Sequence, residues 1–226
     1  MTKAVYILSF LIISSLSIYG QTKFSIVANP QIAWMKPDVK AVKTDGVKFG
    51  FSFGLNMDFY FAENYALSFG ALLLNTGGNL LYNSTNNDSI AFFYLSKAHN
   101  VPSGSSLRYD MKYLEFPVGF KFKTDPFGSL TFYAQTGFNA YFRLTATGTT
   151  NNNDYIDHER FTDEVRGMFL GYHIGGGVEY QLSENTVFTG GIIFNNGFTD
   201  ITTNDAKRKE DRVVLNGLNF RLGIIF

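Results

Sequence analysis

Residues 113–144 read YLEFPVGFKFKTDPFGSLTFYAQTGFNAYFRL, and this stretch decides the fold. On both sides of a central break, apolar and mostly aromatic residues take every other position, with small, polar or charged residues between them. Because successive side chains leave a strand on opposite faces, this period of two predicts strands over 113–122 and 130–144. The break contains the turn residues Asp125, Pro126 and Gly128, so the two strands should form an antiparallel hairpin.

The length and polarity of this hairpin indicate what surrounds it. Strands of soluble proteins usually run about 5–6 residues. A strand that crosses a membrane needs about 9–11 residues at a tilt, with apolar side chains toward lipid and polar side chains toward the lumen. The hairpin therefore predicts two neighbouring strands of a transmembrane barrel.

The same alternation recurs along the chain and predicts eight strands, over residues 22–34, 47–61, 65–75, 107–122, 130–144, 166–182, 186–198 and 213–226. Short connections alternate with long polar ones, which cover residues 35–46, 76–106, 147–165 and 199–212. Bacterial outer-membrane barrels have short periplasmic turns and long extracellular loops, whereas a secreted lipocalin-like barrel would place its aromatic residues inside. We therefore predict an all-β fold, an eight-stranded antiparallel up-and-down transmembrane β-barrel in the outer membrane.

The first 20 residues are predicted to be a cleaved signal peptide, which leaves residues 21–226 as the barrel domain. Lys3 precedes an apolar stretch over 4–16, and Gly20 is a small residue before the expected cut. The sequence has no cysteine, which excludes disulfides, Cys-ligated zinc and a thiol nucleophile. Its formal net charge of zero gives no electrostatic footprint for nucleic acid.

The positions opposite the apolar face should point into the lumen, which in an eight-stranded barrel is just wide enough to be filled by side chains. The charged residues and the histidine among them are Lys48, Asp58, Glu115, Lys121, Arg143, His173, Glu179 and Arg221. Because a buried unpaired charge is costly, we expect a structural network of ion pairs and hydrogen bonds that closes the lumen. Glu115, Lys121 and Glu179 lie toward the short turns, so they are candidates for one shared network. The alternative is a narrow porin for small solutes.

The sequence gives little support to an enzyme. Its three histidines are His99, His158 and His173, and no nucleophile–base pattern accompanies them. His158 lies among several oxygen-bearing side chains, but their spacing fits no defined cation loop, so a solvated polar loop is expected there. We predict a non-enzymatic protein without a metal or cofactor.

Residues 90–95, Ile-Ala-Phe-Phe-Tyr-Leu, form an apolar run inside the long connection 76–106. An exposed run of this kind is an aggregation hazard, so it should be ordered. We expect a β-hairpin that extends strand 65–75 beyond the membrane, with 80–82 as its outgoing arm and 92–95 as its returning arm. It would present Tyr82, Phe92 and Tyr94 to a protein partner, or fold them over the barrel mouth. The rival is a further pair of spanning strands, which would make ten.

Several stretches resemble a known family. YLEFPVGFKF resembles the Tyr-Leu-Glu-x-Pro signature of the PorT-like outer-membrane β-barrel family of Gram-negative bacteria, and residues 175–201 are similar to that family's late hairpin. Phe226 resembles the C-terminal aromatic residue that the barrel-assembly machinery recognises during insertion into outer-membrane lipid. The resemblance implies a barrel with a structural or interaction role through its extracellular loops, or an accessory role in protein secretion or gliding. The length of the connection 76–106 departs from the family's pattern.

Overall fold

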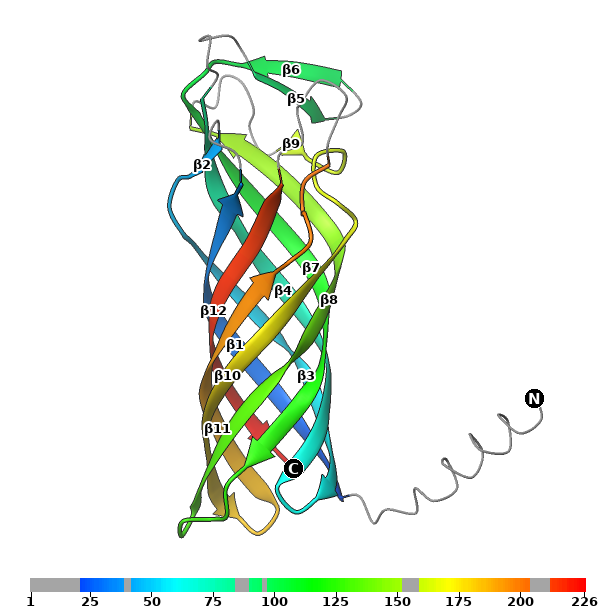
Figure 1. Ribbon diagram of the computed structural model, residues 1–226, viewed down its shortest axis with the longest axis vertical. Coiled ribbons are helices and arrows are strands. Elements are labelled where there is room, and N and C mark those ends of the chain that lie inside the picture. Colours follow the sequence, from blue (N-terminus) through cyan, green and yellow to red (C-terminus); the bar gives the residue numbers. More distant parts are fainter. Residues whose placement is uncertain (1–20, 39–41, 84–89, 95–96, 152–158, 204–211) are drawn as a thin grey trace, which may run out of the picture.

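The computed structural model describes residues 21–38, 42–83, 90–94, 97–151, 159–203 and 212–226, and it shows one long closed barrel (Figure 1). Within this part of the chain, eight long strands form the wall: β1 (Gln21–Pro37), β3 (Lys48–Ala62), β4 (Tyr65–Tyr82), β7 (Ser105–Lys123), β8 (Leu130–Thr150), β10 (Met168–Ser183), β11 (Thr186–Gly197) and β12 (Val213–Ile225). Four short strands accompany them: β2 (Val42–Thr44), β5 (Ile90–Tyr94), β6 (Lys97–Val101) and β9 (Glu159–Arg160). No helix in the described part of the chain is long and apolar enough to cross a membrane.

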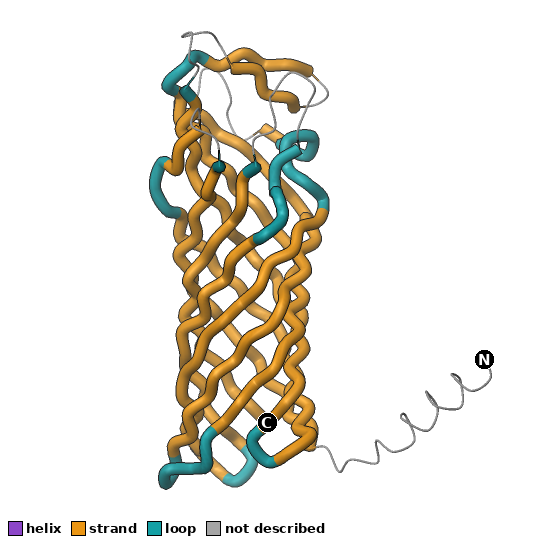
Figure 2. Tube along the Cα trace, in the orientation of Figure 1, coloured by secondary structure: helices purple, strands orange, loops and turns teal. Residues whose placement is uncertain are grey.

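The wall closes because its first and last strands pair. β1 pairs antiparallel with β12 from Ser25↔Ile225 to Pro37↔Val213, and with β3 on its other edge. Each further neighbour in the ring is also antiparallel, including β8 with β10. Figure 2 shows the strands winding obliquely along the barrel. The predicted eight-stranded up-and-down barrel is therefore confirmed. Its short turns lie at one end and its long connections at the other, as the spacing of the strands predicted.

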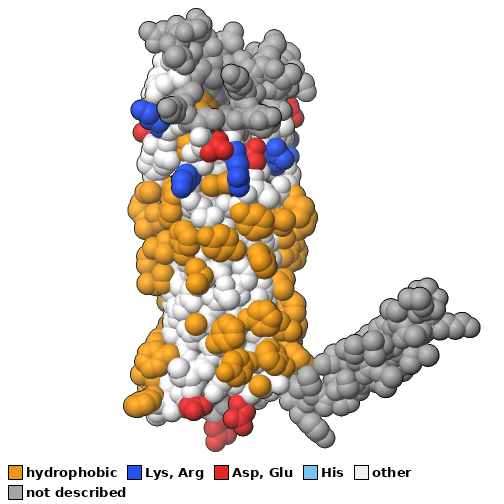
Figure 3. Space-filling model, viewed as in Figure 1, with side chains coloured by type: hydrophobic (Ala, Val, Ile, Leu, Met, Phe, Trp, Pro, Cys, Tyr) orange, Lys and Arg blue, Asp and Glu red, His pale blue; other side chains and the backbone are white. Residues whose placement is uncertain are grey.

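Large apolar side chains cover the outer surface of the barrel's turn-side half. Phe49 is 78% exposed and Phe138 68% exposed, and Figure 3 shows such residues in bands around the wall. At the turn end, the rings of Tyr65 and Phe122 meet edge to face at 5.8 Å, and Phe61 lies 6.4 Å from Tyr65. An exposed apolar surface this extensive, with aromatic residues at its margin, is the lipid-facing belt of a membrane barrel.

Strand β7 shows where this belt ends. At one height along the barrel, its outward face changes from apolar to charged, and its inward face changes from polar to apolar. Between Leu114 and Phe122 its outward residues are apolar, and its inward residues include the buried Glu115 and Lys121. Above that level the outward residues are Arg108, Asp110 and Lys112, and the inward residues are Leu107, Tyr109, Met111 and Tyr113. The upper part of the barrel therefore has a water-facing exterior and an apolar core, which explains why β4 and β8 run past their predicted ends at 75 and 144.

The predicted hairpin of the connection 76–106 is wrong in its pairing. The upper part of β4 pairs with β7, through Tyr82↔Ser105, and its other edge pairs with β2, so no free edge remains for residues 92–95. Strand β5 instead pairs with β6 in a separate two-stranded sheet beyond the end of the barrel (Figure 1). The ten-stranded alternative is therefore wrong as well. The side chains of Phe92, Tyr94 and His99, and all of residues 1–20 and His158, lie outside what the structure describes.

Candidate functional site

The lumen is filled by three layers of side chains, and the one nearest the short turns is ionic. This ion layer consists of Asp58 on β3, Lys121 and Lys123 on β7, and Glu179 on β10. The Lys121 Nζ atom lies 2.7 Å from Asp58 Oδ2 and 2.7 Å from Glu179 Oε1, and Lys123 Nζ lies 2.8 Å from Glu179 Oε2. Because Lys121 and Lys123 are two residues apart on one strand, both point inward.

Further groups support the ion layer from the surrounding wall. The Ser68 hydroxyl donates to Asp58 Oδ1 at 2.6 Å, and Lys121 Nζ lies 5.0 Å from the centre of the Tyr133 ring. Asp58 and Glu179 are 4% and 3% exposed, so their charges are compensated almost entirely by these contacts rather than by water. Since its members come from three separated strands, the layer ties opposite sides of the barrel together.

The middle layer is polar and mostly uncharged. This polar layer consists of Glu115, Gln135, Asn139, His173, Asn195 and Arg221. Asn139 is at its centre: its Nδ2 donates to Glu115 Oε1 at 3.1 Å, and its Oδ1 accepts from His173 Nδ1 at 2.6 Å. Arg221 Nη1 donates to Gln135 Oε1 at 2.8 Å.

The sequence made Glu115, Lys121 and Glu179 candidates for one shared network. In the structure, Glu115 lies outside the network that Lys121 and Glu179 form. Six residues separate Glu115 from Lys121 on β7, which corresponds to roughly 20 Å along a strand. Its carboxylate contacts the Asn139 amide and the Tyr141 hydroxyl, and the charged group that acts on it is Arg221 of the same layer. The sequence pattern therefore found inward positions but not the layer to which each belongs.

The third layer is an apolar plug in the upper part of the barrel. It consists of Ala33, Met35, Val42, Leu74, Leu80, Tyr82, Leu107, Tyr109, Met111, Tyr113, Tyr141, Ala146, Phe161, Val165, Phe169, Ile201, Val213 and Leu215. The Phe169 ring stacks on Tyr141 at 4.2 Å and meets Tyr113 edge to face at 5.0 Å. The hydroxyls of Tyr82 and Tyr109 lie 2.7 Å apart. Tyr82, which was expected either to face a partner or to fold over the barrel mouth, is therefore part of the interior.

Two connections that had been predicted as polar loops close the plug from above. Phe161, Val165 and Ile201 are at most 1% exposed and reach inward from residues 161–166 and 200–203, which we call the cap. Within the cap, Arg166 N donates to Ile201 O at 2.8 Å and Thr203 N to Glu164 O at 2.9 Å. The backbone of the cap therefore continues the hydrogen bonding of the wall across the mouth.

Two small cavities lie between side chains of these layers. A cavity of about 20 Å³ is lined by polar-layer residues, and one of about 10 Å³ lies between Gln31, Tyr141 and Phe169. Each is comparable to the space that one water molecule needs. Among the described residues, no three His, Cys, Asp or Glu side chains lie together as a metal site would require.

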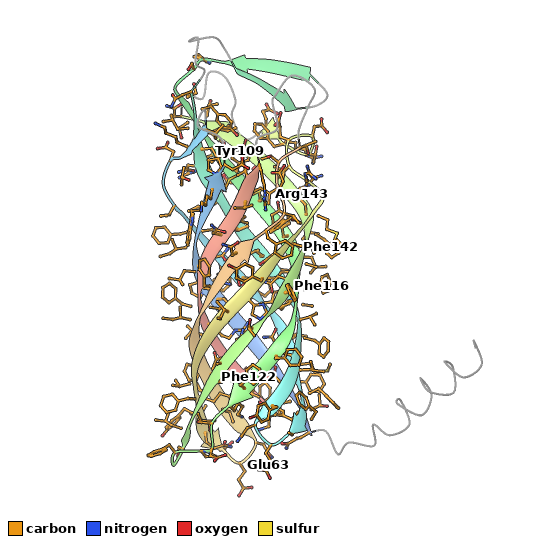
Figure 4. The ribbon with its side chains drawn as sticks, in the orientation of Figure 1. Glu63, Tyr109, Phe116, Phe122, Phe142 and Arg143 are labelled. Atoms are coloured by element: carbon orange, nitrogen blue, oxygen red, sulfur yellow. The ribbon has the colours of Figure 1, made fainter. Side chains whose placement is uncertain are left out.

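Two of the predicted lumen residues lie apart from the layers. Lys48 forms an ion pair with Asp110, which stands at an outward position of β7, and its Nζ also donates to the Thr76 carbonyl at 3.3 Å. Arg143 Nη1 donates to the carbonyl groups of Thr162, at 2.8 Å, and of Val165, so it holds the cap (labelled in Figure 4). Lys48 and Arg143 both lie at the height where the strands leave the lipid-facing belt. The alternation of apolar and polar residues could not by itself show that the exterior of the wall becomes polar at this height.

Phe226 completes the edge of the last strand. Its backbone N–H donates to Phe24 O at 2.8 Å and its carbonyl accepts from Phe24 N at 3.3 Å. Its ring is 59% exposed and belongs to the aromatic margin of the belt. The structure thus places Phe226 at the closing seam between β1 and β12.

The chain matches a known domain family, and several solved structures are similar to it. A family model described as outer membrane protein beta-barrel domain matches residues 15–203. Similar solved structures include Neisserial surface protein A (12% identity, 89% of this chain and 95% of that chain, TM-score 0.49) and the outer membrane protein OprG from Pseudomonas aeruginosa (11%, 91% and 95%, 0.48). Another is the outer membrane protease OmpT from Escherichia coli (9%, 93% and 97%, 0.49). A search of curated protein sequences returned no match.

Proposed function

The chain belongs to the outer membrane protein β-barrel domain family, and from this premise we propose that it is a closed, non-enzymatic barrel that acts through its extracellular part. The observation that carries the proposal is the filling of the lumen. An ion layer, a polar layer and an apolar plug follow one another along the axis, and two cavities that lie among the residues of the polar layer and the plug hold about 20 and 10 Å³. No solute larger than water fits such spaces.

Planar-bilayer recording of the purified mature protein tests the closed state. We expect no stable current step in the wild-type protein, because conduction would require the ion layer and the plug to separate together. Heat-modifiable migration of the same preparation shows that folded barrels were present. A reproducible open level in wild type would contradict the proposal and favour the narrow-porin alternative, for which the polar layer would be the lining.

The surroundings of His173, the histidine whose side chain the structure describes in the lumen, support a non-enzymatic role. His173 is 5% exposed, its Nδ1 is bonded to Asn139, and the cavity beside it holds about 20 Å³. A general base must reach the proton that it abstracts, and no substrate has access to this one. The proposed role is therefore structural or interactive, with extracellular protein contacts and insertion by the barrel-assembly machinery as its expected partnerships.

Within the family, we propose a PorT-like relationship on the motif Tyr113-Leu114-Glu115-Phe116-Pro117. Three of its residues have distinct positions that support reading the motif as architectural: Tyr113 lies in the plug, Glu115 in the polar layer, and Phe116 on the lipid side. An accessory role in protein secretion or gliding follows from that relationship. Deleting the gene and measuring exported proteins in the medium tests it, and unchanged export and motility would remove the support for this role.

A further inference from the structure

A groove of about 600 Å³ lies on the outer wall of the barrel, just above the lipid-facing belt. It crosses four neighbouring strands and is lined by Asn75, Asp110, Lys112, Leu144, Thr145, Ala146, Thr147, Arg160 and Thr162. The pairing of the strands brings the lining residues of the groove together, because Lys112 pairs with Thr145 and Thr147 pairs with Arg160. Apart from Ala146, whose side chain points inward, these residues therefore form one continuous outer surface on β4, β7, β8 and β9, with Thr162 just beyond β9.

The groove carries positive charge that its own carboxylate does not neutralise. Lys112 and Arg160 are exposed, and neither has an ion pair among the described residues. Asp110 is the one carboxylate among the groove's lining residues, and Lys48 already pairs with it. Two cationic groups are consequently available to a ligand, with the hydroxyls of three threonines beside them.

A β-bulge connects this polar groove to the apolar belt. The register of β7 and β8 shifts between Lys112 and Tyr113, so Leu144 and Thr145 both stand on the exposed face, and Leu144 is 54% exposed. Directly below, Phe116 and Phe142 meet edge to face at 5.8 Å on the lipid side (Figure 4). An occupant of the groove would thus touch charges above and an apolar surface below.

The level of the groove identifies the kind of occupant. Lys112 is the first charged residue above the apolar outward run of β7, at the height where the belt ends and water begins. Lipid headgroups occupy that height in a membrane, and basic pockets at the membrane surface bind anionic headgroups. A free anion would gain no binding energy from the apolar side chains of Leu144 and Phe142 at the lower edge of the groove.

We propose that this groove binds the phosphorylated headgroup of an outer-leaflet lipid. Lys112 and Arg160 pair with the phosphate through charge-assisted hydrogen bonds, and the threonine hydroxyls donate to its remaining oxygens. Leu144 and Phe142 pack along the first part of an acyl chain. The inference concerns the outer wall and is independent of whether the lumen conducts.

Native mass spectrometry of the folded protein in detergent, with added diphosphoryl lipid A, tests the proposal. Lys112→Gln combined with Arg160→Gln should weaken lipid retention roughly thirtyfold, since two basic groups are removed and each contributes about 1 kcal/mol near a membrane surface. The matched control is Lys36→Gln combined with Lys43→Gln, which removes the same charge from exposed positions outside the groove. The control should retain lipid like wild type.

Further arms separate this headgroup site from less specific binding. Dephosphorylated lipid A, with the same acyl chains, should bind wild type as weakly as diphosphoryl lipid A binds the groove variant. Equal losses in the groove variant and the control would mean general charge attraction and would overturn the proposal. Equal retention of both lipids, or displacement of lipid A by equimolar inorganic phosphate, would also overturn it. Heat-modifiable migration verifies that each variant is folded.

Discussion

The two halves of this barrel share the same strands but are built for different surroundings. In the turn-side half the exterior is apolar and the interior holds ions and amides; in the upper half the exterior is charged and the interior is an apolar plug (Figures 1 and 3). On β7 the change takes place within three residues, from Lys112 to Leu114. The solvent outside therefore decides which face of one continuous strand is polar, and the interior takes the opposite character.

This contrast implies that an aromatic side chain contributes a different amount to the free energy of unfolding in each half. Phe169→Ala in the plug should lower the free energy of unfolding by about 3–5 kcal/mol, because a fully packed ring is lost and a cavity remains. Phe49→Ala on the belt should change it far less, since Phe49 is 78% exposed and lipid or detergent replaces its contacts. Urea unfolding followed by the fluorescence of Trp34, the chain's one tryptophan, measures both. Similar losses in the two variants would show that the plug is not a packed core.

A reciprocal exchange on β7 tests where the belt ends. Val118→Arg places a charge on the lipid side and should cost about 2–4 kcal/mol if the position lies near the bilayer midplane. Arg108→Val makes the opposite change ten residues earlier and should alter stability by no more than about 0.5 kcal/mol, as expected of a surface position. The measurement is the unfolding free energy in lipid vesicles. A large loss in the Arg108 variant, or none in the Val118 variant, would place the boundary elsewhere.

The same contrast explains which features the sequence could predict. The strands of the belt were predictable because lipid on one side and polar side chains on the other give a local period of two. The plug was not, because Tyr109 and Tyr113 have the same parity as Glu115, and only the position of the membrane surface separates them. The change from Asp110 and Lys112 to Leu114 on the outward face was the available signal.

The cap and the bulge escaped prediction for a different reason. Phe161, Val165 and Ile201 are isolated apolar residues in polar connections, and their burial depends on contacts with strands far away in sequence. The bulge opposite Lys112 inverts the parity of β8, so that Ala146 rather than Thr145 points inward. No local sequence pattern predicts a β-bulge, in which one strand has one extra residue relative to its partner. Asp58, Lys121 and Glu179 of the ion layer were predicted as inward positions, but Lys123 was missed because it lies one residue beyond the predicted strand end at 122. The separation of the ion layer from Glu115 required the actual heights of the strands.

Within the turn-side half, the smallest and sharpest comparison sets the ion layer against the polar layer. Glu179→Gln removes a charge that pairs with both Lys121 and Lys123, so it should lower the unfolding free energy by about 2–3 kcal/mol. Glu115→Gln keeps an oxygen that accepts from Asn139 Nδ2 and breaks no ion pair, so its effect should stay below about 1 kcal/mol. The two substitutions are chemically identical and both sites are buried, so each is the control for the other. Equal losses would mean that Glu115 carries a charge that its neighbours, Arg221 among them, stabilise as strongly as two lysines stabilise Glu179, and the division into ionic and polar layers would fail.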